Sequence, residues 1–376
     1  MMCKGFGFSS DQMNQGAVMT LLKQLLPLAA LLLLSIVPTE TEVVTSVEDC
    51  NEFFLKKTPP NITRILGGGK ILNQSRYKLI CQTLNNTTTF VTLYDTQNKI
   101  PVFSAAKFNG STSGRPQVPW MIEPQLENPS DNPNMRPSNN STNYKHQAGD
   151  KDYKNTGFSR GHLFPSSYGS TVLKRNSTFT LTNIVPQNKD FNSGSWNKME
   201  NCIKCVLNEY CKNNSNIEGF VVIGAQPSNN RLNQIISIPS VLWSTFCCYS
   251  QIQNSWLASA HWGNNRNHGP EHLDTKTLGE LYTELGIEVF PETQCPKNTT
   301  VTHLYSHLPS NCSCPSKMSS KSVQSTYFSS PETSVPLSTT SGKSTTAPMS
   351  TTIASVKKFK VNVARVYFMG LSFISS

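Results

Sequence analysis

One histidine, His162, is a candidate for proton transfer; it lies in the segment GFSRGHLFPSS at residues 157–167. Arg160 precedes it by two residues, so a permanent positive charge accompanies an imidazole that titrates near neutral pH. A neutral imidazole can act as a general base and take a proton from water. A lone loop histidine is weak support for catalysis by itself, so the residues around it decide the question.

Further polar residues follow at helical spacing. Asn192, Trp196 and Glu200 are four residues apart, so in a helix they lie along one face. The amide oxygen of Asn192 is a hard ligand that suits Mg²⁺, and Glu200 could hold the waters of such an ion. The alternative for Asn192 is a structural role as the N-cap of the helix, where Asn is a preferred residue.

The elements that would position these residues are predicted by the same part of the chain. Residues 179–184 are typical of a strand, and the segment around His162 can lie antiparallel to it. Apolar residues three and four positions apart predict a helix at about residues 193–211. The result is a ββα unit with His162 on its first strand and polar residues at the start of its helix.

Elsewhere, strands outnumber helices. Strands are predicted at residues 77–81, 89–94, 100–106, 220–224, 241–249 and 256–262. A second helix is predicted at about 274–285, and the Asn-, Pro-, Ser- and Gly-rich residues 109–150 predict a long loop that flanks the substrate. Because strands and helices do not alternate strictly, we expect an α+β fold with a mainly antiparallel central sheet flanked by helices.

The first 40 residues resemble a targeting segment. A short basic start at residues 19–23 precedes a leucine-rich apolar run at 25–37, which Pro38 ends. This is the pattern of a secretory signal peptide, and the run is short for a membrane span. We predict a signal peptide over residues 1–40, with Met19 a candidate true start; an uncleaved signal anchor is the alternative.

The cysteines agree with export. Of the eleven, Cys3 lies in the leader, and the ten that remain are an even number. Exported proteins use cysteines mainly in disulfides, so we expect bridges whose pairing the spacing does not reveal. Cys202 and Cys205 could form half of a zinc site, but no second CxxC pair follows at the spacing of a zinc ribbon.

Sites for N-glycosylation are dense and support a secreted glycoprotein. The pattern N-x-[ST] occurs at Asn61, Asn73, Asn86, Asn109, Asn140, Asn176, Asn213, Asn298 and Asn311.

The net charge of +10 is spread along the chain without a basic run. It suits a polyanionic partner such as nucleic acid, but it suits many other secreted basic proteins equally well.

The folded domain is expected at residues 48–315, and 316–376 differ in composition. Residues 316–355 are dominated by Ser, Thr and Pro, which predicts a disordered or O-glycosylated tail. The partly apolar end at 361–374 contains Arg365 and is short for a span, so membrane association through the tail stays an open alternative.

The order of the polar motifs resembles one family, the DNA/RNA non-specific endonucleases, which are His-Me finger (ββα-metal) nucleases. SRGH at residues 159–162 resembles the family's Asp-Arg-Gly-His signature, and TNIVPQ at 182–187, FNSG at 191–194, Trp196 and Glu200 follow in family order. The spacings from His162 to Asn183, Asn192 and Glu200 also suit it.

The resemblance covers roughly residues 48–297. Within the family it extends to the endonuclease domain-containing 1 proteins of vertebrates, through an exported N-terminus and several further segments. These include IPVFS at 100–104, WMIEPQ at 120–125 and the adjacent pair Cys247-Cys248.

The resemblance implies a role for each residue. His162 is the general base, and Asn192 is the ligand of a divalent cation, Mg²⁺ or also Mn²⁺. Glu200 orients water near that cation, and Arg160 neutralises charge on the phosphoryl group. Asn183 helps to shape the site, with a buried amide satisfied by backbone as the alternative. The implied partner is the backbone of DNA, RNA or both, with no small-molecule cofactor.

One position departs from the family: Ser159 stands where the signature has Asp. A missing carboxylate removes negative charge beside the cation, which favours a weakened enzyme. The second hypothesis is therefore a non-catalytic extracellular glycoprotein that keeps the nuclease fold for binding. A third, a zinc hydrolase that uses His268 and His272, is disfavoured because Pro270 between them argues against one helix presenting both.

Overall fold

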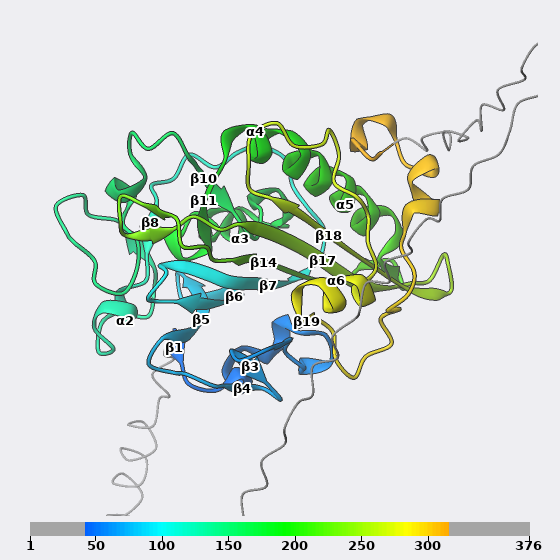
Figure 1. Ribbon diagram of the computed structural model, residues 1–376. Coiled ribbons are helices and arrows are strands. Elements are labelled where there is room, and N and C mark those ends of the chain that lie inside the picture. The colour runs from blue at the N-terminus through cyan, green and yellow to red at the C-terminus, as the bar shows by residue number, and fades with distance from the viewer. Residues whose placement is uncertain (1–41, 316–376) are drawn as a thin grey trace, which may run out of the picture. The chain divides into compact units, whose positions relative to one another are not determined.

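The computed structural model describes residues 42–315 (Figure 1). Its centre is a seven-stranded antiparallel sheet in the order β1-β5-β6-β7-β14-β17-β18. The prediction of an α+β fold with a mainly antiparallel sheet is confirmed. The expected signal peptide at 1–40 and the expected tail at 316–376 lie outside the described residues. Within 42–315, no helix has the length and apolar character needed to span a bilayer.

The six long strands of this sheet each contain one of the strands predicted from the sequence. The strands are β1 (Val43–Val44), β5 (Tyr77–Leu84), β6 (Thr87–Asp95), β7 (Ile100–Phe108), β14 (Gly219–Gln226), β17 (Val241–Ser250) and β18 (Ser255–Asn264). The short strand β1 pairs with β5 and precedes residue 48, where we expected the domain to begin.

Side chains of the central strands alternate between two apolar layers, because successive residues of a strand point to opposite faces. On β14, Val221 and Ile223 join one layer while Val222 joins the other. On β17, Cys248 lies in the first layer and forms a disulfide with Cys211, which follows α5. The neighbouring Cys247 lies in the second layer and bonds to Cys295, so two adjacent residues link the sheet to both layers.

The first layer contains the predicted ββα unit. β10 (Ser159–His162) pairs antiparallel with β11 (Ile184–Gln187). α4 (Lys189–Phe191), a π-helical turn (Asn192–Trp196) and α5 (Asn197–Tyr210) follow one another and cover this face of the sheet (Figure 1).

Two predicted boundaries of this unit were wrong. The helical segment begins at Lys189 rather than at residue 193, because Asn188 caps it and accepts a hydrogen bond from the Asp190 N–H. The strand expected at 179–184 is mostly a turn with a 3-10 helix, η5 (Leu181–Asn183), and pairing starts only at Ile184. Here the Asn183 side chain donates to the Thr178 carbonyl, a local bond that competes with strand pairing.

The second layer covers the opposite face. It contains the 3-10 helix η1 (Val47–Phe53), a small sheet in the order β19-β2-β3-β4 and helix α6 (Leu278–Leu285). The small strands are β2 (Asn61–Ile62), β3 (Leu66–Gly67), β4 (Lys70–Ile71) and β19 (Ile287–Glu288). Helix α6 starts at Leu278 and not at 274, because Thr277 and Glu280 form a capping box.

The remaining elements are short. The expected loop at 109–150 is interrupted by β8 (Met121–Ile122), α2 (Pro124–Glu127) and β9 (Arg136–Pro137). The others are η2 (Leu55–Lys57), η3 (Asp150–Tyr153), η4 (Ser166–Tyr168), α3 (Val172–Ser177), β12 (Lys212–Asn213), β13 (Asn216–Ile217), β15 (Arg231–Leu232), β16 (Ile236–Ser237), η7 (Thr302–His307) and η8 (Ser310–Cys312).

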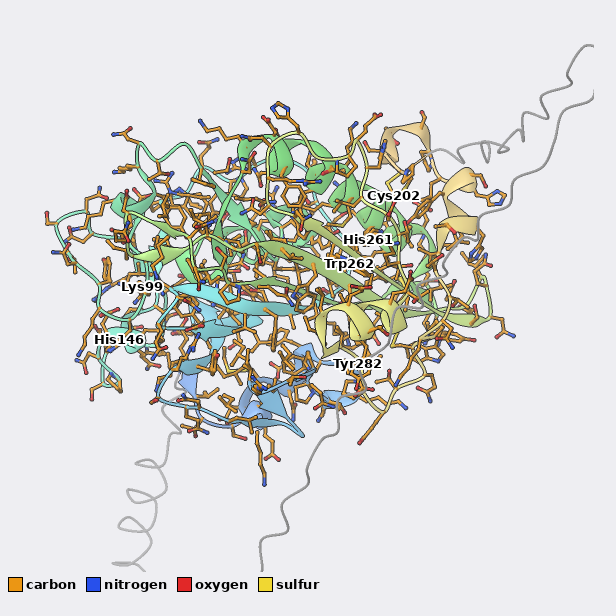
Figure 2. All side chains as sticks on the ribbon, in the orientation of Figure 1. Lys99, His146, Cys202, His261, Trp262 and Tyr282 are labelled. Atoms are coloured by element: carbon orange, nitrogen blue, oxygen red, sulfur yellow. A yellow bond between two sulfur atoms is a disulfide. The ribbon has the colours of Figure 1, made fainter. Side chains whose placement is uncertain are left out.

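All ten cysteines within 42–315 form disulfides, as the sequence predicts. The pairs are Cys50–Cys81, Cys202–Cys314, Cys205–Cys312, Cys211–Cys248 and Cys247–Cys295. Cys202 and Cys205 therefore form no zinc site; they join α5 to the segment that contains η8. Figure 2 labels Cys202 on this helix.

Candidate active site

A pocket of about 830 Å³ opens where β10, the π-helical turn, α5 and the loop before β8 meet. It is lined by Thr112, Ser113, Gly114, Arg115, Trp120, Phe158, Ser159, Arg160, His162, Pro165, Ser166, Ser167, Asn192, Ser193, Asn197, Glu200 and Lys204. Four of the five predicted site residues, His162, Arg160, Asn192 and Glu200, thus lie on one pocket. The expected long loop also contributes to its wall.

The β10–β11 pair sets the position of His162. His162 lies opposite Ile184, and Gly161 lies opposite Val185. A Cβ atom on Gly161 would lie 2.0 Å from Oε1 of Gln187, so any side chain there would displace Gln187. The glycine of the SRGH segment is therefore required by the close packing of the two strands.

His162 lies in the pocket wall beside two aromatic rings. Its ring centroid is 5.5 Å from that of Trp120 and 4.9 Å from that of Phe179. Burial and, to a smaller extent, the positive charge of Arg115 lower the pKa of His162 to about 3. The imidazole is therefore neutral at neutral pH, and its Nε2 atom is buried with no hydrogen-bond partner in residues 42–315.

Asn192 is not the N-cap of the helix, so the alternative of a capping role for this residue was wrong. Asn188 is the cap, and Asn192 has helical dihedral angles inside the continuing helix. The π-helical turn starts at Asn192, and Gly194 leaves helical geometry within it at φ −96°, ψ −114°. Turns of this type occur frequently at functional sites. The Asn192 side chain makes no hydrogen bond to any described residue, so its amide is free to face the pocket.

Glu200 lies two turns further along, on the same pocket wall. Burial raises the pKa of its carboxyl to about 8, while the Trp196 indole and Lys204 oppose the shift. The indole N–H makes no standard hydrogen bond within the described chain, so we attribute the shift mainly to burial. The Tyr168 hydroxyl donates to the Glu200 carbonyl at 3.0 Å and ties α5 to the segment after β10.

Arg160 lines the pocket, but a carboxylate already engages it. Its Nη2 atom lies 2.7 Å from Oδ1 of Asp150 and donates to the Asp150 carbonyl at 3.1 Å. The guanidinium carbon lies 5.6 Å from the Trp120 ring centroid. These contacts hold the guanidinium at the pocket edge and reduce the charge it presents there.

Asn183 does not line the pocket, and its predicted part in shaping the site stays a prediction. The residue is fully buried. Its Oδ1 accepts from Ser104 Oγ at 2.9 Å and from the Phe164 N–H at 3.0 Å, while its Nδ2 donates to the carbonyls of Phe164 and Thr178. With its bonds satisfied internally, Asn183 fixes the chain just after His162 and contacts no substrate.

Three residues of the pocket were missed as site residues. Arg115 lies in the expected loop, Trp120 begins the WMIEPQ segment, and Lys204 is one turn beyond Glu200 on α5. The spacing from Glu200 to Lys204 could have revealed the last of these. Arg115 and Trp120 precede His162 by more than forty residues, and only the fold brings them to it.

The donor atoms on the pocket suit a hard divalent cation held by few protein groups. An amide and a carboxyl are oxygen donors, and Mg²⁺ keeps most of its waters, for which the pocket has room. Within residues 42–315, no three His, Cys, Asp or Glu side chains gather as a metal cluster. His268 and His272 do not line the pocket, so the geometry gives the zinc hypothesis no support.

Comparison with known proteins adds three findings. Residues 68–274, more than half of the chain, match the DNA/RNA non-specific endonuclease family. The Endonuclease domain-containing 1 protein of Homo sapiens is 30% identical over 207 residues, which cover 53% of this chain and 39% of that protein. Nuclease EXOG, mitochondrial, of Mus musculus is 47% identical over 53 residues, which cover 13% of this chain and 14% of that protein.

The matched region spans well under half the length of the curated relatives. Among solved structures, a chain of the EndoG/EndoGI complex aligns with a TM-score of 0.43 at 15% identity, over 57% of this chain and 88% of that chain.

Proposed function

Because the chain belongs to the DNA/RNA non-specific endonuclease family, we propose that it is a metal-dependent endonuclease that hydrolyses phosphodiester bonds of DNA, RNA or both. The observation that carries the proposal is the meeting of neutral His162, Asn192 and Glu200 on one pocket. His162 comes from strand β10, and Asn192 and Glu200 come from two turns of the helical segment that follows β11.

His162 acts as the general base. Its Nδ1 atom is the acceptor, because Nε2 is enclosed by the aromatic wall. Water gives a proton to the imidazole, its oxygen bonds to phosphorus, and the ester bond to the leaving oxygen breaks. A free-state pKa of about 3 makes a weak base, but a bound phosphate brings negative charge, which raises the pKa of a neighbouring imidazole.

Three cations on the pocket, Arg115, Arg160 and Lys204, attract and orient the polyanion. Asn192 would hold a divalent cation, Mg²⁺ or Mn²⁺, and Glu200 would hold the waters of that cation; when bound, the cation would stabilise negative charge on the scissile phosphate and its leaving oxygen. Because the pKa of Glu200 is raised, its carboxyl must lose a proton to act as a charged acceptor for those waters.

We further propose that the domain is exported and N-glycosylated, after removal of residues 1–40. The five disulfides favour an oxidising compartment. Each of the nine asparagines in N-x-[ST] patterns is at least partly exposed, as attachment of a glycan requires. Enzymatic deglycosylation of the secreted protein should lower its apparent mass; a cytosolic product of unchanged mass would refute the proposal.

The nuclease proposal is tested by incubating the purified chain with plasmid DNA and with RNA in Mg²⁺, in Mn²⁺ and in EDTA. We expect cleavage that needs the metal and decreases as salt is added, because binding to phosphates releases counterions. Undiminished cleavage in EDTA would refute the metal dependence. A folded protein that binds nucleic acid but cleaves nothing at any metal concentration would favour the non-catalytic glycoprotein.

A further inference from the structure

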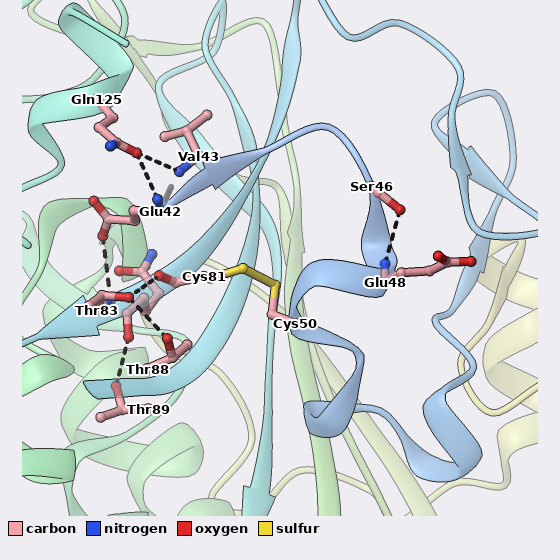
Figure 3. The surroundings of a disulfide bond; sticks show 11 residues. Glu42, Val43, Ser46, Glu48, Cys50, Cys81, Thr83, Thr88, Thr89 and Gln125 are labelled. Atoms are coloured by element: carbon pink, nitrogen blue, oxygen red, sulfur yellow. Dashed lines mark hydrogen bonds between the residues drawn. A yellow bond between two sulfur atoms is a disulfide. The ribbon is translucent and has the colours of Figure 1, made fainter. Parts of the chain in front are cut away.

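Two glutamates are buried together behind the aromatic wall of the pocket. Glu42 is 1% exposed and Glu123 is 0% exposed. Oε1 of Glu123 accepts hydrogen bonds from the hydroxyls of Thr180 and Thr182. Oε1 of Glu42 accepts from the Thr83 N–H at 3.5 Å, as Figure 3 shows. The two Oε2 atoms are also buried, and neither has a hydrogen-bond donor among residues 42–315.

In the described part of the chain, no positive charge compensates this pair. No Lys, Arg or His within 42–315 forms an ion pair with either carboxyl. Their neighbours on β5 and α2, Gln82, Thr83 and Gln125, are uncharged.

Within 42–315, no hydrogen bond or ion pair joins either carboxyl to a titratable side chain outside the pair. The amide of Gln147 donates to the Glu123 carbonyl and to the Glu127 carboxylate, and Glu127 also accepts from the His146 N–H. Arg136, on the strand next to β8, is paired with Asp131 at 3.2 Å. Among the described residues, the titratable partner of each carboxyl is therefore the other carboxyl.

Two ionised carboxylates cannot stay in contact in a dry interior, since burial and mutual repulsion both oppose the second charge. The two groups lie within hydrogen-bonding reach of each other, and burial raises the pKa of both. A single proton shared by the two carboxyls makes one of them a hydrogen-bond donor and the other its acceptor. It also removes one of the two buried charges.

The pair is connected to both aromatic residues that contact His162. Trp120 is three residues before Glu123, and the Met121 N–H donates to the Phe179 carbonyl at 2.8 Å. Thr180, next to Phe179, donates its hydroxyl to Glu123.

The same cluster holds β1 in place. The Oε1 atom of Gln125 accepts from the backbone N–H groups of Glu42 and Val43 at 2.7 and 3.0 Å (Figure 3). One buried cluster thus supports both the edge of the central sheet and the wall of the pocket.

We propose that Glu42 and Glu123 share one proton, and that this proton holds the aromatic wall of Trp120 and Phe179 in place, so that Glu123 is a positioning residue for His162. The structural part of this proposal stands alone; its consequence for catalysis rests on the proposed nuclease function. Loss of the proton leaves two like charges in contact, which the fold relieves by separating β1 from the wall.

The sign of the stability effect follows from the raised pKa values. The folded protein keeps a proton that the unfolded chain releases above its ordinary glutamate pKa, so the pair's contribution to stability is greatest in acid and falls as pH rises. The unfolding equilibrium constant should increase about tenfold per pH unit in this window for one linked proton.

The experiment measures unfolding by denaturant between pH 5 and pH 9 in EDTA, for the wild type, Glu123→Gln and Glu42→Gln. In either variant the new amide can donate to the remaining carboxyl, so no proton needs to be held. The tenfold change of the unfolding equilibrium constant per pH unit should therefore be lost in each variant. Glu284→Gln, an exposed carboxyl-to-amide change on α6, is the matched control and should keep the wild-type slope. Glu200 also has a raised pKa, but its contribution to the pH dependence is the same in all four proteins and cancels when they are compared. A wild-type slope in both variants would overturn the proposal.

A second readout tests the positioning role without any nuclease assay. The imidazole NMR signal of His162, assigned by its loss in His162→Ala, should move with pH in the wild type over the window of the pair. It should stay constant in Glu123→Gln over that window. An unchanged pH response in the variant would overturn the link to the pocket, whether or not the protein cleaves nucleic acid.

A bound cation, instead of a shared proton, could also hold the two carboxylates together. Adding Ca²⁺ at pH 8 distinguishes these two explanations. Proton sharing predicts no stabilisation that depends on Glu123. If Ca²⁺ stabilised the wild type but not Glu123→Gln, the pair would be a cation site and the proposal would be wrong.

Discussion

The two faces of the central sheet are built differently. The layer with η1, the small sheet and α6 has no buried side-chain polar atom without a hydrogen-bond partner in the described residues. The layer with β10, β11 and α5 has several, among them His162 Nε2, Arg160 Nε, both amide atoms of Gln187 and the Trp196 indole nitrogen. The pair Glu42 and Glu123, near the wall of the pocket, adds two more.

Buried polar atoms without partners reduce stability, and native proteins contain few of them. Their concentration on one face indicates that this face is shaped for something other than stability. The opposite face contains features that stabilise the fold. Helix α6 begins with a capping box and ends at Gly286, which is in the left-handed region at φ 68°. The comparison predicts that changes on one face alter chemistry and changes on the other alter stability.

The largest effect is expected at His162. His162→Ala should lower turnover on plasmid DNA by about 10²–10⁴-fold, the usual contribution of a general base. The midpoint of thermal unfolding should change little, because the imidazole makes no hydrogen bond within 42–315. His303→Ala, at an exposed position, is the control and should cleave normally. Wild-type turnover in His162→Ala would reduce the histidine to a wall residue.

On the other face of the sheet, Leu281→Ala should lower the free energy of unfolding and leave kcat of the folded protein unchanged. Leu281 is fully buried on α6, and removal of such a side chain costs about 2–5 kcal/mol of unfolding free energy. Its neighbour Tyr282, 59% exposed (Figure 2), offers the control Tyr282→Ala, which should change stability by about 0.5 kcal/mol or less. Chemical denaturation and kcat of the folded fraction measure the two effects. A large loss of kcat in folded Leu281→Ala would contradict the division between the faces.

A smaller gain is expected at Ser159, which lines the pocket beside Arg160. Ser159→Asp adds a negative charge near the proposed cation, and losses of such outer groups typically cost about 10–100-fold in metal affinity or activity. The variant should therefore cleave faster than the wild type, most clearly at low Mg²⁺. A Mg²⁺ titration of both proteins on plasmid DNA measures this. Ser159→Asn, without the charge, should show no gain; equal gains would refute the electrostatic explanation.

The smallest effect concerns pH and His261 (Figure 2), which is 3% exposed on β18. Burial lowers its pKa to about 3. His261 takes up a proton below the ordinary histidine pKa in the unfolded chain but not in the folded protein. Its contribution to stability therefore falls as pH decreases. Between pH 6.5 and 5.5 this should cost about 1 kcal/mol.

His261→Gln should remove that loss, as measured by denaturant unfolding at the two pH values. The exposed His303→Gln should keep it. Equal acid sensitivity of His261→Gln and the wild type would show that His261 is protonated in the folded protein.

Local patterns determined much of this molecule before any contact was known. Apolar segments located the six long strands, with clear alternation in those that became β6 and β7, and helical spacing located the segment that contains Asn192 and Glu200. An even number of cysteines predicted bridges. These features depend on residues within a few positions of one another, so a short stretch of chain carries them completely.

The tertiary structure decided what depends on distant residues. Adjacent Cys247 and Cys248 bond in opposite directions because successive residues of β17 point to different layers. From the sequence, Asn183 was equally compatible with a site role and with a structural role. In the structure its side-chain amide forms hydrogen bonds with Ser104, Phe164 and Thr178. The wall around His162 and the glutamate pair behind it join segments far apart in the chain, and no local pattern encodes burial that arises only when those segments pack together.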